Sequence, residues 1–64
     1  MTYSEIVENA KAKASEASII ECLLAIADCH DTLRVGQHDG TPYGVKLWAE
    51  IDAYRDRSLA LSRL

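Results

Sequence analysis

The most apolar part of the chain is residues 19–27, which hold most of the large aliphatic side chains of the first half. On a helix, these side chains would cover far more than one face. A segment that is apolar over so wide an arc needs neighbours on more than one side. The chain offers only one other apolar segment, residues 45–64. The pattern therefore predicts two helices that pack against each other and then against a second copy.

The first helix is expected to begin at residue 3. Thr2-x-x-Glu5 matches a capping box, in which the two side chains satisfy backbone N–H groups at a helix start. Neither proline nor glycine interrupts the chain before Gly36, and residues 10–18 combine small side chains with high helix propensity. The sequence thus predicts one long helix over about 3–34.

A short turn over 35–41 is expected next, followed by a second helix over about 42–63. Thr41 supplies an N-cap side chain, and Pro42 suits the first helical position. Lys46 and Glu50 are spaced to pair on the outer face of this helix. One face carries a heptad seam, with spacings that alternate between four and three: Tyr43, Leu47, Ile51, Tyr54, Ser58 and Leu61.

The apolar face of the first helix moves around its axis. Its first half presents Tyr3, Ile6, Val7, Ala10, Ala14 and Ala17, whereas its second half presents Ile19, Leu23, Ile26, His30 and Leu33. At 100° per residue these stripes point in different directions, so they cannot both face one straight neighbour. The second helix is also shorter by roughly 12 Å, which would leave residues 3–14 uncovered within one chain. Both features favour self-association.

The predicted fold is therefore all-α: a single domain over 1–64, an antiparallel two-helix hairpin that dimerises into a four-helix bundle. The residues expected at the intrachain contact are Ile20, Leu23, Ile26, Leu47, Ile51, Tyr54 and Leu61. The residues expected at the dimer interface are Ile6, Val7, Ala10, Ala14, Ala17 and Leu24, where alanines would allow two backbones to approach closely.

Composition narrows the class of protein. At 64 residues the chain is marginal for an independent core, and 48% hydrophobic with 27% charged residues is typical of a globular domain. The formal net charge of −3 has the wrong sign for a polybasic binder. The start lacks a signal-peptide pattern, and no apolar run approaches the ~20 residues that span a bilayer. We expect a cytoplasmic protein with no membrane association.

The two cysteines are Cys22 and Cys29. If both lie on one helix, their Cα atoms are roughly 10 Å apart along its axis. An intrachain disulfide needs less than ~7 Å and is therefore excluded. We expect both to be reduced, small core residues, with an interchain bond across a symmetric dimer as the alternative.

Residues with catalytic or metal-binding side chains gather in one part of the sequence: Asp28, Cys29, His30, Asp31, His38 and Asp39. On a helix the first four point in four directions, so they do not converge on one ion. A metal site or a nucleophile–base pair would need His38 from the turn. A small enzyme or metal-binding protein that uses Cys29, His30 and His38 is therefore the third hypothesis, and no cofactor is expected.

Helix surface remains as the functional element. The first hypothesis is a small non-enzymatic regulator or adaptor that binds, and by binding can inhibit, a larger protein as a homodimer. Trp, Tyr and Arg dominate such contacts, and the residues expected to bind the partner are Tyr43, Trp48, His38 and Arg55. The alternative is a nucleic-acid-binding dimer, although Asp52 and Asp56 neutralise most of the basic end of the second helix.

Overall fold

The computed structural model describes residues 2–36 and 40–63, and within these residues the fold is three α-helices without a strand. Helix α1 is Tyr3–Ala14, α2 is Ile19–Gly36 and α3 is Pro42–Ser62. The all-α prediction is confirmed, but the number of helices is three rather than two.

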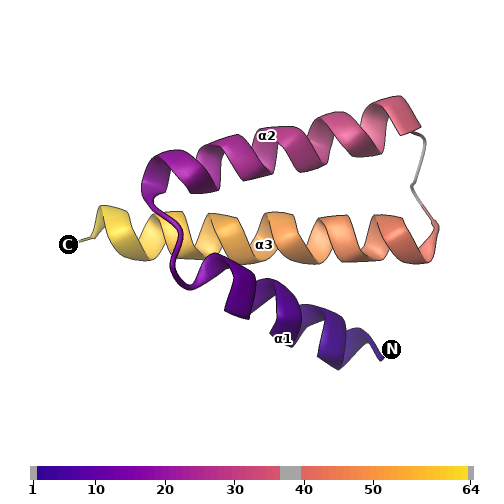
Figure 1. The fold of residues 1–64 in the computed structure, drawn as a ribbon, viewed down its shortest axis with the longest axis horizontal. Coiled ribbons are helices and arrows are strands. Elements are labelled where there is room, and N and C mark those ends of the chain that lie inside the picture. Colours follow the sequence, from indigo (N-terminus) through magenta and orange to yellow (C-terminus); the bar gives the residue numbers. More distant parts are fainter. Residues whose placement is uncertain (1, 37–39, 64) are drawn as a thin grey trace.

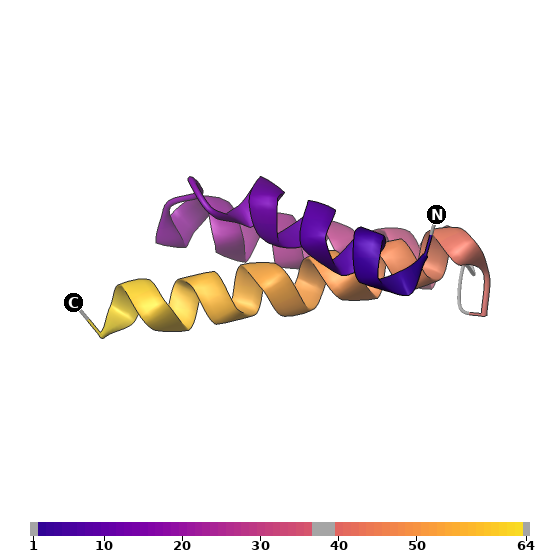
Figure 2. The same cartoon turned by 90° about the horizontal axis from the view of Figure 1, so that it is seen from below.

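Helix α3 is the central element, with α2 packed along one side of it and α1 along the other (Figure 1). Helices α2 and α3 run in opposite directions, whereas α1 is inclined across α3. Figure 2 shows that α1 and α2 are displaced to the same side of α3, so the three axes do not share a plane. The result is a thin molecule of 36 × 25 × 13 Å. Helix α3 lies between α1 and α2 in Figure 1 and below both of them in Figure 2.

Two of the predicted helix starts are confirmed in detail. The Thr2 hydroxyl accepts a hydrogen bond from the Glu5 N–H at 3.2 Å, and the Glu5 carboxylate accepts from the Thr2 N–H at 3.3 Å. The Thr41 hydroxyl accepts from the Gly44 N–H at 3.0 Å, with Pro42 at the first helical position. Of the expected turn, residues 37–39 lie outside the described part of the chain, and Gly40 has a positive φ of 81°.

The prediction of one continuous helix over 3–34 is wrong, because the chain turns between Ala14 and Ile19. At the end of α1, Ser15 donates from its hydroxyl to the Ala12 carbonyl at 2.7 Å. At the start of α2, the Ser18 hydroxyl accepts from the Glu21 N–H at 3.2 Å, and the Glu21 carboxylate accepts from the Ser18 N–H at 3.1 Å. These bonds form a second capping box, which replaces the helical bonds that the turn breaks.

The turn allows the two apolar stripes of residues 3–17 and 19–33, which would point in different directions on one straight helix, to face the same neighbour. A straight helix could not direct both halves of its apolar surface at one neighbour, but two shorter helices can. The Arg57 side chain of α3 donates to the Ala17 carbonyl in the turn at 3.2 Å, which holds the turn against the C-terminal half of α3. Both halves of the first segment therefore pack on α3 within one chain.

The interface between α2 and α3 holds the large apolar side chains of the core. Leu33, Leu47 and Ile51 are buried together, and Ile26 and Cys29 pack against them. The prediction that Leu47 and Ile51 lie in this interface is confirmed. The prediction that Ile20 and Leu23 lie there is wrong, since both are exposed. The reason is rotation: α2 directs its Cys22, Cys29 and Leu33 side towards α3, so Ile20 and Leu23 face away. Tyr54 and Leu61 are half-buried.

The interface between α1 and α3 is built from small residues. Ala10 and Ala14 of α1, Ala17 of the turn and Ala49 of α3 are all buried. The expectation that residues 3–14 lack an intrachain cover is therefore wrong. Ala10, Ala14 and Ala17 were assigned to the dimer interface, and their own chain covers them instead. Of the other residues assigned there, Ile6 and Val7 are half-buried and Leu24 is exposed.

Candidate functional site

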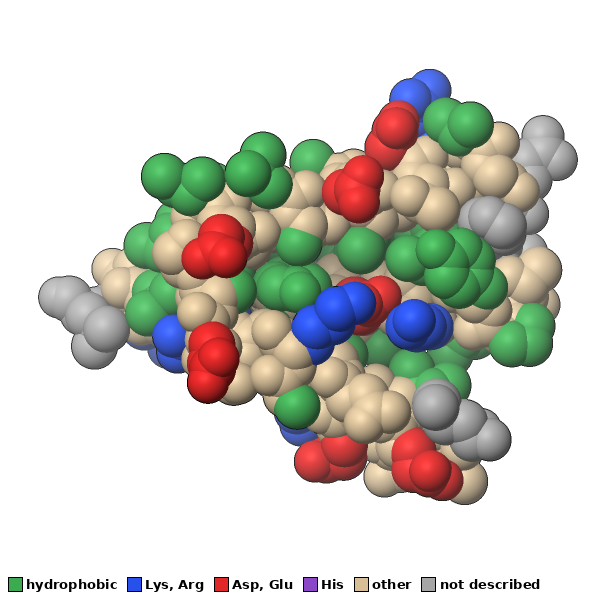
Figure 3. Space-filling model, in the orientation of Figure 1, with side chains coloured by type: hydrophobic (Ala, Val, Ile, Leu, Met, Phe, Trp, Pro, Cys, Tyr) green, Lys and Arg blue, Asp and Glu red, His purple; other side chains and the backbone are tan. Residues whose placement is uncertain are grey.

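An ion pair joins α1 to α3, and side chains of α2 line a hollow beside it. Lys13 of α1 donates to the Glu50 carboxylate of α3 at 2.7 Å. The Glu50 side chain is only 8% exposed, so its charge is held away from water and Lys13 is its counter-charge. The hydrogen bond to Glu50, followed by the attraction between the two charges, raises the pKa of Lys13. In Figure 3 basic side chains lie over an acidic one near the middle of this face.

This pairing corrects the expected Lys46–Glu50 contact on an outer face. Glu50 lies on an inner face of α3 because α1 crosses over it. Lys46 stays exposed and lines the same hollow as Lys13 and Glu50. The sequence suggested a partner for Glu50 four residues away on its own helix, whereas the partner is 37 residues away on another.

Two hollows of about 300 Å³ flank the ion pair. One lies between α1 and α3, beside Ile6, Asn9 and Ala10. The other lies between α2 and α3, and its lining brings together the polar groups of both helices: Asp28, Cys29, Thr32, Tyr43, Lys46 and Tyr54. Burial raises the pKa of the Cys29 thiol and of the Tyr54 hydroxyl. Cys29 therefore stays a protonated thiol at neutral pH, and a thiol is a poor nucleophile.

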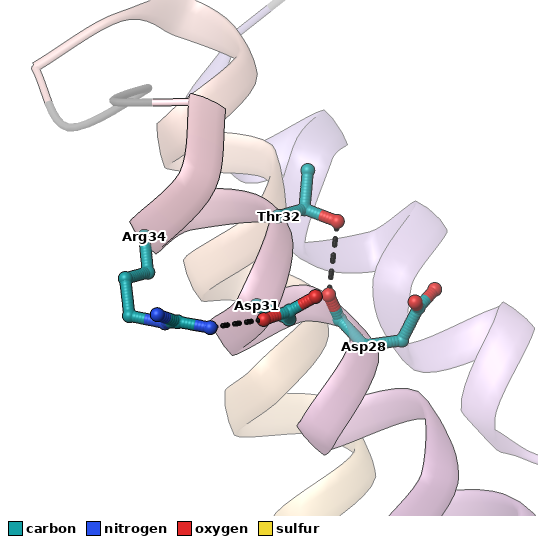
Figure 4. Close-up of polar contacts among 4 residues, drawn as sticks. All are labelled: Asp28, Asp31, Thr32 and Arg34. Carbon is teal, nitrogen blue, oxygen red and sulfur yellow. Dashed lines mark hydrogen bonds and ion pairs between the residues drawn. The ribbon is translucent and has the colours of Figure 1, made fainter.

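The cluster of Asp28, Cys29, His30 and Asp31 is dispersed around α2. Figure 4 shows the Asp28 and Asp31 carboxylates pointing to opposite sides, with Asp31 accepting from Arg34 at 2.6 Å. The Thr32 hydroxyl donates to the Asp28 carbonyl rather than to its carboxylate (Figure 4). Within residues 2–36 and 40–63, no three His, Cys, Asp or Glu side chains are placed to hold a metal ion. His38 and Asp39 lie outside the described residues.

His30 has a different neighbour from Cys29. Its imidazole meets the Trp48 indole edge-to-face, with ring centroids 5.5 Å apart and an interplanar angle of 86°. Cys29, one residue earlier, packs against the core. The two side chains therefore lie on different sides of α2, and the base expected for Cys29, His38, lies outside the described residues. Both cysteines are free, with Cys22 completely buried.

Trp48 belongs to a row of exposed residues on α3, whose edges meet α2 at His30 and α1 at the hollow beside Asp52. The row follows the spacing 3, 4, 3, 4 and consists of Val45, Trp48, Asp52, Arg55 and Leu59, all exposed. Arg55 donates to the Asp52 carboxylate at 2.9 Å in its middle. We call these five residues the open face of α3. Of the residues expected to bind a partner, Trp48 and Arg55 lie on it, whereas Tyr43 lines the hollow beside Cys29 and His38 is outside the described residues.

Of the seven basic side chains, all of which lie in the described part of the chain, four have polar partners within it. Lys13, Arg34 and Arg55 are in ion pairs with carboxylates, and Arg57 donates to a backbone carbonyl. A nucleic-acid surface gains affinity from several unpaired cations in a row. These four side chains are therefore not unpaired cations of that kind, and the alternative of nucleic-acid binding stays a prediction.

Comparisons with protein-family models, with curated proteins and with solved structures give no match to this chain. None of the described helices is long and apolar enough to cross a bilayer.

Proposed function

We propose that the protein is a small non-enzymatic regulator or adaptor that binds a larger protein through the open face of α3. The observation that carries this proposal is Trp48, which is 45% exposed on the outside of a helix although its ring could fill a core. Exposed tryptophan is costly in water and is the residue most enriched at binding hot spots.

The surroundings of Trp48 suit a protein ligand. The edge-to-face contact with His30 restrains the indole, so less rotamer freedom is lost on binding. Val45 and Leu59 extend the apolar surface along the helix, and the Asp52–Arg55 pair between them offers both signs of charge. A row at heptad spacing is the pattern by which a helix docks into an apolar groove or beside another helix.

An enzymatic function has less support. The hollows beside Glu50 are near the lower end of the range for ligand pockets. Burial raises the pKa of their thiol, and their most buried carboxylate is already paired with Lys13. We therefore place the function on the surface of the helices.

The experiment is a capture assay that compares three baits: the wild-type chain, Trp48→Ala and Tyr43→Ala. Tyr43 is the matched control, since it is an aromatic residue of the same helix with 46% exposure that lines another part of the surface. We expect a protein that the wild type and Tyr43→Ala retain and that Trp48→Ala loses. Equal retention by all three baits, or turnover of a small molecule by the purified chain, would refute the proposal.

A further inference from the structure

The first half of α2 carries three exposed large aliphatic side chains, of which Leu24 also borders a hollow with Tyr54 of α3. Ile20 is 70% exposed, Leu23 58% and Leu24 66%. With the exposed Ala27 they follow the spacing i, i+3, i+4, i+7, which is one continuous stripe on a helix. Figure 3 shows hydrophobic side chains projecting from the edge of the molecule over the first half of α2. We call these four residues the outer stripe of α2.

The spacing of residues in the outer stripe is the same in both directions along the helix, so two antiparallel copies can match each other. Read backwards, the positions 20, 23, 24 and 27 give the same spacing. If a second α2 lies antiparallel across a two-fold axis between Leu23 and Leu24, Ile20 of each copy lies over Ala27 of the other. Leu23 of each copy then meets Leu24 of the other. Each of these contacts then occurs twice, once in each direction, as an isologous interface requires.

The exposed apolar area is enough for a weak pair of copies only. The three large side chains expose roughly 350 Å² of apolar surface, which is within the range of the largest, often functional, patch on a monomer. Pairing two copies would cover roughly 700 Å², and polar neighbours at the rim add to it, towards the ~1,200 Å² of the smallest specific interfaces. The expected dimer is therefore a weak one.

The single chain also has little core of its own. Among the described residues, the large aliphatic side chains that are buried are Leu33, Leu47 and Ile51, and the other buried apolar residues are alanines and Cys22. Domains of this size usually need an additional source of apolar burial. A second copy supplies it without requiring any other molecule.

We propose that two copies of the chain pair through the outer stripe of α2, in the antiparallel register that places Ile20 over Ala27. This interface differs from the one that the sequence pattern suggested, because Ala10, Ala14 and Ala17 are covered by α3. It leaves the open face of α3 accessible. The inference goes beyond the proposed function, and each can fail alone: Trp48→Ala tests partner binding, whereas the variants below test pairing.

The experiment is sedimentation velocity on the full chain from about 10 µM to about 1 mM, a range that covers weak association. We expect the mass to rise from that of one 7.1 kDa chain to twice that value. Leu24→Glu should raise the dissociation constant by roughly 100-fold, because it buries a carboxylate in the pair. Val35→Glu is the matched control: it is also 70% exposed on α2, but lies beyond the overlap of the two stripes. Far-UV circular dichroism checks that each variant remains helical.

A mixing experiment tests the register. Leu23→Lys and Leu24→Glu should each be monomeric alone. An equimolar mixture should recover the dimer, because the ammonium group introduced in one copy would meet the carboxylate introduced in the other. A wild-type chain that stays monomeric at the highest concentration would overturn the inference. So would a dimer that Leu24→Glu leaves intact, or a mixture that does not re-associate.

Discussion

The two sides of α3 that pack against other helices differ in chemistry. Towards α2, α3 presents Leu47 and Ile51, which join Leu33 in a cluster of large aliphatic side chains. Towards α1 it presents Ala49 and the buried Glu50, which meet small residues and Lys13. The first contact is held by the apolar area removed from water. The second contact consists of small side chains around one charge pair. It stabilises the fold less than the first, but the charge pair limits the positions that α1 can take along α3.

This difference implies unequal stability. The α2–α3 pair should carry most of the free energy of folding, and α1 should be the helix that separates first under denaturant. It also implies that substitutions act differently at the two contacts. Truncating a side chain should cost most stability at the α2–α3 contact, whereas enlarging a side chain or removing a charge should cost most at the α1–α3 contact. The substitutions below test this contrast.

The largest effect is expected from Ile51→Ala in the α2–α3 cluster. Ile51 is 3% exposed, and truncating a buried isoleucine costs about 2–5 kcal/mol. A chain of 64 residues has a total stability of about 3–10 kcal/mol, so this variant should be largely unfolded at moderate urea. Urea titration followed by circular dichroism measures the change. A loss below about 1 kcal/mol would show that this cluster is not the main source of stability.

A smaller and more local effect is expected from Ala14→Leu in the α1–α3 contact. Ala14 is 2% exposed, and extra methylene groups in a close-packed contact cost about 1–3 kcal/mol. Ala12→Leu, at an exposed position on the same helix, is the control and should change little. Hydrogen exchange should show loss of protection in α1 while α2 and α3 keep theirs. Equal loss in all three helices would contradict the separate roles of the two contacts.

The α2–α3 contact could be predicted from the sequence better than the α1–α3 contact, for a physical reason. Leu47 and Ile51 follow a heptad seam of large side chains, and burying them stabilises the fold whatever the remaining chain does. The position of α1 depends on the turn at residues 15–18, and serine within a helix costs only a few tenths of a kcal/mol. Such a small difference in helix propensity does not determine whether the helix continues or the chain turns. The packing of both halves of residues 3–36 on α3 determines it.

The turn nevertheless left a signal in the sequence. Ser18-x-x-Glu21 precedes an apolar run and has the same form as Thr2-x-x-Glu5, which was interpreted as a helix start. Taken together, the two motifs predict two helices. No comparable motif in the sequence indicates that Glu50 pairs with Lys13. This contact exists only because the turn brings α1 across α3. Trp48 and Arg55, two of the residues predicted to bind a partner, lie on the open face of α3, and their binding stays a prediction.

The next effect in size is expected from Lys13→Met. This variant keeps much of the side-chain volume but leaves the Glu50 carboxylate buried without its counter-charge, which should cost about 1–2 kcal/mol. Lys46 lines the same hollow and limits the loss, so the double variant with Lys46→Met should lose more than the sum of the single ones. Lys11→Met is the control, since Lys11 is an exposed lysine of the same helix. Chemical denaturation at neutral pH measures all four variants.

The same pair predicts a pH dependence. The pKa of Lys13 is raised above its ordinary value of 10.5 in the folded state, because Glu50 accepts a hydrogen bond from the ammonium group. Its stabilising effect is therefore fully present below pH 10.5 and is lost as the pH rises through the higher folded value. Wild-type stability should fall more steeply there than that of Lys13→Met. Parallel curves for the two chains would show that Lys13 does not contribute through its charge.

The smallest effect, and the most informative about the contrast between the two contacts, is expected from Ser18→Ala. Loss of the cap costs about 1 kcal/mol, and it also favours the continuous helix, in which α1 no longer reaches α3. Thr2→Ala removes the same kind of cap at the other end of α1, away from the turn, and is the control: it should weaken α1 slightly without releasing it. Hydrogen exchange along α1 distinguishes the two results, because only Ser18→Ala should expose Ala10 and Ala14.

A pH titration adds a second test of this cap. The Ser18 N–H and hydroxyl lower the pKa of Glu21 below its ordinary value of 4.5. The cap therefore stabilises the fold above pH 4.5 and is lost as the pH falls through the lower folded value. Acidification should release α1 before the α2–α3 pair unfolds, and Ser18→Ala should remove that early step. If the early step persists in Ser18→Ala, the turn is held by its packing on Arg57 and α3 rather than by its cap.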